Sequence, residues 1–98
     1  MGKLLIIGAY VFLVFSSDIH ELRRHIHVQI KQGKHRNGLP LCKFWLEPEI
    51  ELAYNHGIPE TEITAIKAHI HLHCELIHQQ LDEFYAGRKV NIITLPNL

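Results

Sequence analysis

The chain has 98 residues, of which 47% are hydrophobic and 20% are charged, and its formal net charge is zero. These proportions are typical of one soluble globular domain with a modest core, and they argue against a strongly nucleic-acid-binding chain. Only two cysteines, Cys42 and Cys74, are present, without a CxxC pair, which excludes a disulfide framework and predicts reduced thiols in a cytoplasmic protein.

The first apolar run extends from Leu4 to Phe15 and is rich in β-branched and aromatic residues. It predicts one strand over residues 4–15, covered on both sides and bent or bulged at Gly8. The alternative is a secreted protein in which residues 1–17 are a signal peptide. The strand is preferred because no small-x-small cleavage site follows, and the run is too short to span a bilayer as a helix.

The stretch RRHIHVQI, which ends at Ile30, lies in a second predicted strand over residues 24–31. Its apolar and polar residues alternate, and side chains two apart share one face of a strand. Ile26 and Val28 are therefore expected in the core, while His25 and His27 lie on the opposite face.

Asn37-Gly38 is a turn signal, and strands are predicted after it over residues 41–47 and 49–54. Antiparallel pairing with the preceding strand would place three side chains on the histidine face, namely Lys43, Trp45 and Glu47. In the fourth strand, three alternating side chains are expected to point into the core: Ile50, Leu52 and Tyr54.

A helical pattern predicts one long helix over residues 59–86, with Pro59 in its first turn and Gly87 as its stop. The main apolar stripe comprises Ile63, Ile66, Ile70, Cys74, Ile77, Leu81 and Phe84. A second, weaker apolar stripe lies on nearly the opposite side of the helix and consists of Ala65, Leu72 and Leu76. It predicts a contact with a second copy or a partner protein; scattered surface leucine is the alternative.

Residues 89–95 are expected to form a short last strand or a tail. Together the elements predict a single α+β domain over residues 1–98. Its sheet is mainly antiparallel with three to five strands, and one long C-terminal helix packs on one face.

The zero net charge hides an uneven distribution. Residues 21–43 contain six basic residues and one acidic residue, whereas residues 44–86 contain eight acidic residues and one lysine. The basic segment is suited to contact phosphate groups or an acidic partner, and ordinary solvated charge is the alternative. Nucleic-acid binding is therefore only weakly supported.

The nine histidines are many for a chain of this length. His25 and His27 have the right chemistry to hold a divalent metal such as zinc or manganese, with Asp18, His20 or Glu47 as a further ligand. The alternative is an exposed strand face that tolerates histidine. Four helix histidines are expected in solvent or at an interface: His69, His71, His73 and His78.

The same strand face is also suited to acid–base catalysis. His25 and His27 would transfer protons and Glu47 would orient them, as in a ribonuclease-like phosphodiesterase. Three neighbours would contact the substrate or its phosphate: Arg23, Lys43 and Trp45. However, the sequence has no nucleophile motif, phosphate-binding glycine loop or zincin helix.

Three stretches, YVFLVFSSDIHELRRHIHV, CKFWLEPEIELAYNHG and LDEFYAGRKV, resemble a bacterial family of small proteins, domain of unknown function 4160. The best markers are Asp18, the pair His25 and His27 followed by Val28, and the KFWLEP run. Many relatives have prolines just before the first histidine, where this chain has arginines.

The resemblance implies a small cytoplasmic α+β protein with no established activity, often encoded beside a second small protein, from domain of unknown function 2442. It therefore suggests an interaction partner in a two-gene, toxin–antitoxin-like or regulatory module. The partner would be that adjacent gene product or a second copy in a homodimer, with no membrane contact. A ribonuclease-like phosphodiesterase and a divalent-metal-binding domain are the alternatives.

Overall fold

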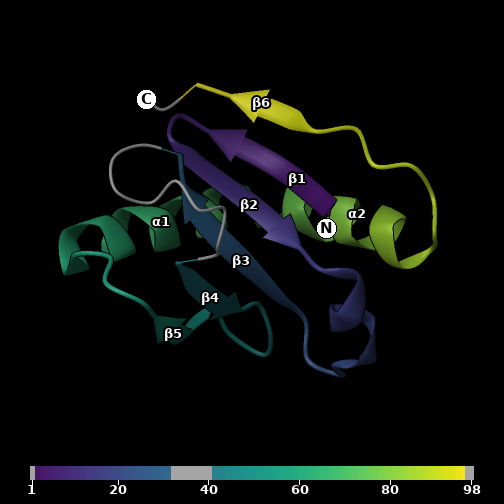
Figure 1. Ribbon diagram of the computed structural model, residues 1–98, viewed down its shortest axis with the longest axis horizontal. Helices are drawn as coiled ribbons and strands as arrows, with labels where there is room; N and C mark the ends of the chain where they lie inside the picture. Colours follow the sequence, from purple (N-terminus) through teal and green to yellow (C-terminus); the bar gives the residue numbers. More distant parts are fainter. Residues whose placement is uncertain (1, 32–40, 97–98) are drawn as a thin grey trace.

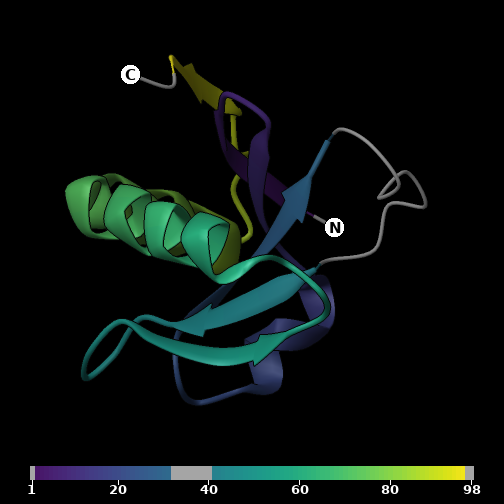
Figure 2. The same cartoon turned by 90° about the vertical axis from the view of Figure 1, so that its left-hand side faces the viewer.

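The computed structural model describes residues 2–31 and 41–96. Six strands form one sheet in the order β5-β4-β3-β2-β1-β6. Two consecutive helices, α1 and α2, lie across one face of this sheet (Figures 1 and 2). The predicted α+β class is confirmed, but the expected three to five strands were too few.

The strands are β1 (Gly2–Ile7), β2 (Tyr10–Val14), β3 (His25–Ile30), β4 (Cys42–Trp45), β5 (Glu51–Asn55) and β6 (Ile93–Leu95). A 3₁₀ segment, η1 (Ser16–His20), connects β2 to β3. Neighbouring strands pair antiparallel, except that β6 runs parallel to β1. The sheet is therefore mixed, and the predicted C-terminal strand exists as its short edge.

The first apolar run is a hairpin and not the single strand predicted over residues 4–15. Gly8 has a φ of 57°, and with Ala9 it joins paired residues Ile7 and Tyr10. A two-residue hairpin turn favours glycine at a position with positive φ, so Gly8 reverses the chain where a bend was expected. The covered central strand that the run predicts is β2, whose residues are all buried.

The core lies between the helices and the sheet. A register shift between Lys3 and Leu5 leaves Leu4 as an extra residue in β1, and Leu4 and Leu5 are both fully buried. Cys42 is also buried, and this burial raises the pKa of its thiol to about 12, as fits a small apolar packing residue. No helix in the described ranges is long and apolar enough to cross a membrane.

The predicted helix over residues 59–86 is two helices, α1 (Glu60–Leu72) and α2 (Cys74–Tyr85). His73 separates them with φ −111° and ψ 25°, outside the helical range. Apart from Leu72, the run HIHLHC at the break consists of weak helix formers. The main apolar stripe nevertheless continues across it, with four members fully buried or nearly so: Ile66, Ile70, Ile77 and Leu81.

Strand β5 differs from the predicted alternation. Phe44 pairs with Leu52, but the neighbouring Lys43 pairs with Tyr54, so Ala53 is an extra residue. Since paired residues share a face, the bulge places Tyr54 on the histidine side of the sheet. Leu52 shares the face of the core residue Phe44, as predicted, but it is 39% exposed. Tyr54 lies on the opposite face and is 36% exposed, so the prediction that it points into the core was wrong.

Gln80 attaches the C-terminal segment to the sheet from the middle of α2. Its buried side-chain Nε2 donates hydrogen bonds to the carbonyl oxygens of Leu4, at 2.9 Å, and Asn91, at 2.7 Å. One amide thus joins β1, α2 and the segment that leads to β6.

Replacing Gln80 by methionine keeps the side-chain length and removes both hydrogen bonds. We expect the free energy of unfolding to fall by about 1–3 kcal/mol, because a buried acceptor is left unsatisfied. Urea denaturation would measure the loss. The exposed neighbour provides the control, and Gln79→Met should change stability by less than about 0.5 kcal/mol. Equal effects of the two substitutions would contradict this role of Gln80.

Candidate functional site

The face of β3 that carries the histidines is buried. The sequence had left open an exposed strand face that merely tolerates histidine. As predicted, Ile26 and Val28 lie in the core, and His25 and His27 point to the other side. Yet His25 has no exposed surface and His27 is 6% exposed. The η1 connection folds back against this face, and the Phe15 ring packs edge-on against His27 at 4.9 Å between centroids.

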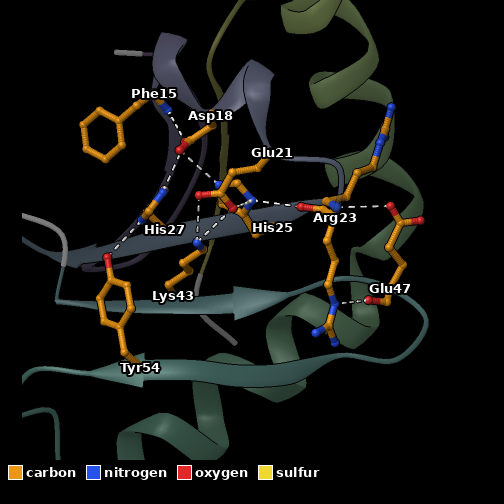
Figure 3. Close-up of polar contacts among 10 residues, drawn as sticks. Phe15, Asp18, Glu21, Arg23, His25, His27, Lys43, Glu47 and Tyr54 are labelled. Atoms are coloured by element: carbon orange, nitrogen blue, oxygen red, sulfur yellow. Dashed lines mark hydrogen bonds and ion pairs between the residues drawn. The ribbon is translucent and has the colours of Figure 1, made fainter.

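Asp18 brings the two histidines together (Figure 3). Its Oδ1 lies 3.1 Å from His25 Nε2, and its Oδ2 lies 3.2 Å from His27 Nε2. The same carboxylate accepts a 2.7 Å hydrogen bond from the backbone N–H of Phe15, which holds it in place at the start of η1. The three candidate ligand atoms all lie within 4.8 Å of one another, and all three residues are buried.

His25 is oriented by its second ring nitrogen. Nδ1 lies 3.1 Å from the carbonyl oxygen of Arg23 and 3.3 Å from a carboxylate oxygen of Glu21. Both groups accept hydrogen bonds, so Nδ1 carries a hydrogen and, in a neutral ring, Nε2 presents a lone pair. This buried Nε2 has no hydrogen-bond partner among the described residues, although it is close to Asp18.

The site favours an ionised aspartate and a neutral His27. Burial acts to raise the pKa of Asp18, but the Phe15 N–H bond, contact with His25 and the two histidine charges together lower it. The pKa of His27 is lowered, chiefly by burial and further by the charges of His25 and Lys43, although Asp18 opposes this.

Two residues that the sequence did not single out complete the cluster. Glu21 lies beside His25, and its carboxylate also pairs with Lys43 Nζ at 3.1 Å. The hydroxyl of Tyr54 lies 3.3 Å from His27 Nδ1. Burial and nearby acidic groups raise the pKa of Tyr54, so its hydroxyl keeps its proton. No sequence signal identifies Glu21, which follows η1. Tyr54 could not be assigned to this face from the sequence, because the bulge in β5 that places it there is not visible in the alternation.

Glu47 forms its hydrogen bonds with Arg23 and Arg24 and not with the two histidines. Its side chain accepts a 3.1 Å hydrogen bond from the backbone N–H of Arg24, and its carbonyl accepts one of 2.6 Å from Arg23 Nε. Of the predicted neighbours, Lys43 and Trp45 do lie on the histidine face, because Lys43 pairs with His27 and Trp45 with His25. Glu47 therefore stabilises the turn after β4 and is not part of the group formed by Asp18, His25 and His27.

The basic residues around the site are matched by acids. Trp45 contacts two cations, with the Arg23 guanidinium 4.5 Å and the Lys43 ammonium 4.3 Å from its ring centroid. Both cations also have an acidic partner, Glu51 for Arg23 and Glu21 for Lys43. This part of the basic segment is thus engaged in contacts within the molecule.

The helix histidines do not gather into a comparable cluster. His69 packs against the Tyr10 ring at 5.9 Å, and His78 Nδ1 lies 3.0 Å from a guanidinium nitrogen of Arg24. Within residues 2–31 and 41–96, only Asp18, His25 and His27 form a group that could hold a metal ion.

The family described as "Domain of unknown function (DUF4160)" matches residues 8–81. The chain belongs to this family. The resemblance seen in the sequence is therefore confirmed, and every member of the cluster lies within the matched region. Comparisons with curated proteins and with solved structures give no match.

The lowered pKa of His27 predicts that the metal-free protein loses stability in mild acid. Between the folded pKa and the ordinary value of 6.5, the unfolded chain binds more protons, so the free energy of unfolding falls as the pH falls. Asp18 extends the loss below its ordinary value of 3.8. Urea denaturation in the presence of chelator, at several pH values from 7.5 down to 4.5, would measure this dependence.

In His27→Gln the dependence between pH 6.5 and 4.5 should become shallower. His71 is exposed on α1 and provides the matched control, so His71→Gln should keep the wild-type profile. An unchanged profile in His27→Gln would show that another group is responsible.

Proposed function

We propose that the protein binds one divalent transition-metal ion through Asp18, His25 and His27. Two imidazoles and one carboxylate are ligands that suit zinc, manganese or iron. The nitrogen–oxygen separations of 3.1 and 3.2 Å are close to those between neighbouring ligands around one ion at about 2.0–2.2 Å. Zinc and manganese, predicted from the sequence, remain the ions of choice.

One observation carries the proposal, and it is the buried Nε2 of His25. In the neutral ring this nitrogen presents a lone pair to the Asp18 carboxylate 3.1 Å away, and burial leaves it without solvent. Two facing acceptors need a proton or a cation between them. A metal ion would bind Nε2 of His25 and the Asp18 carboxylate. Meanwhile Nδ1 of His25 would keep its hydrogen bond to the carbonyl oxygen of Arg23.

The three protein ligands would leave at least one coordination position for water or another small ligand. When bound, the ion would supply Lewis acidity at that position. The chain itself would hold the ligands in fixed orientations: β3 carries both histidines, and η1 delivers the carboxylate from the opposite side.

The ribonuclease-like alternative has less support. Proton transfer to a substrate needs a histidine that the substrate can reach, but His25 has no exposed surface. Glu47, its expected orienting carboxylate, contacts the backbone of Arg24 instead. Metal binding uses the arrangement as it stands.

Zinc titration by calorimetry tests the proposal on protein stripped of metal. We expect one tight site per wild-type chain. In Asp18→Asn the affinity should fall by about 100-fold or more, since removing a ligand should cost at least as much as removing an outer-shell partner. The substitution preserves the size of the side chain, and circular dichroism would verify the fold.

A surface control is needed because exposed histidines can bind zinc weakly. His71→Ala should leave the tight site unchanged, while His27→Gln should weaken it as Asp18→Asn does. If the folded wild-type chain binds neither one zinc ion nor one manganese ion tightly, the metal centre is rejected.

We propose as a second function the partner binding expected from the sequence. Leu72 is 75% exposed at the break between the helices, beside a surface hollow of about 510 Å³ that Leu76 also lines. A large exposed leucine next to a hollow supports a contact with another protein. The adjacent-gene product suggested by the family resemblance is the partner to test.

Co-expression with that product, followed by size-exclusion chromatography, would test partner binding. The two chains should elute together for the wild type and for Asp18→Asn, and separately for Leu72→Glu. Elution of the wild type as a lone monomer in the presence of the neighbour would contradict the interaction.

A further inference from the structure

We infer that Tyr54 is a positioning residue that lets His27 exchange its ring tautomer when the metal binds. The inference rests on the proposed metal centre and concerns its regulation. It is motivated by a difference between the outer contacts of the two histidines, each of which presents Nε2 to Asp18.

The outer nitrogen of His25 faces acceptors only. These are the carbonyl oxygen of Arg23 at 3.1 Å and the carboxylate of Glu21 at 3.3 Å. Neither can donate a hydrogen, so Nδ1 of His25 must carry one whether or not an ion is present. His25 is thus preset as a metal ligand.

The outer nitrogen of His27 instead faces a hydroxyl, that of Tyr54 at 3.3 Å. A phenolic hydroxyl can donate or accept a hydrogen bond. Without metal, Nε2–H of His27 donates to Asp18, which only accepts, and the Tyr54 hydroxyl donates to Nδ1. Every polar atom of this half of the site then has a partner.

With metal, Nε2 of His27 must offer a lone pair to the ion, so the ring hydrogen moves to Nδ1. The Tyr54 oxygen then accepts from Nδ1, and its own hydrogen turns toward solvent, which Tyr54 reaches because it is 36% exposed. The ring keeps one hydrogen throughout, and no buried nitrogen loses its partner.

The sheet supplies this hydroxyl through an irregularity. The extra residue in β5 pairs Tyr54 with Lys43, which in turn pairs with His27. Regular alternation would point Tyr54 to the helix side, where it could not reach the ring. The bulge therefore determines which outer partner His27 has.

Nitrogen-15 NMR of the histidine rings at pH 7.5, with and without zinc, tests the inference directly. His27 should change from the Nε2–H to the Nδ1–H tautomer on zinc addition, while His25 keeps its hydrogen on Nδ1. In Tyr54→Phe the zinc dissociation constant should rise by about 10-fold, as for loss of an outer-shell partner.

Tyr10 provides the matched control, because its hydroxyl bonds to Glu62 and not to the cluster. Tyr10→Phe should bind zinc as the wild type does. If zinc binds tightly but His27 keeps its tautomer, or Tyr54→Phe binds equally well, the role of Tyr54 is overturned and the metal centre stands. If the folded wild-type chain binds no zinc, the metal centre and this inference both fall.

Discussion

The cluster depends on one buried contact, in which the carboxylate of Asp18 meets the Nε2 atoms of His25 and His27. Burying an ionised group is costly unless it is paired and hydrogen-bonded. Here the Phe15 backbone and two imidazoles surround the carboxylate. Because Asp18 belongs to η1, the same contact holds the β2–β3 connection against the sheet and gives the histidine face its cover.

The two arginines before His25 connect this face to the rest of the molecule. Arg23 stacks on Trp45 of β4, and Arg24 reaches α2, where it contacts His78 and forms an ion pair with Asp82. The connection from η1 into β3 is thus held in place by the side chains of Arg23 and Arg24.

Much of the fold could be predicted from periodicity, and the departures have local causes. The alternation in RRHIHVQI correctly separated Ile26 and Val28 from the histidines. Periodicity does not reveal where a continuous apolar run reverses, so the turn at Gly8 was interpreted as a bend. It also carries no information on an extra residue such as Ala53, and for that reason Tyr54 was assigned to the wrong side. The cover over His25 arises from an irregular segment with no period at all.

The members of the proposed metal trio lie close together in the chain as well as in space. Asp18 and His27 are nine residues apart, so closing the loop between them costs little conformational entropy. The pairing of β1 with β6, in contrast, joins the two ends of the chain. Since contacts between near neighbours in sequence generally form faster than those between distant ones, the trio is expected to assemble before the sheet is complete.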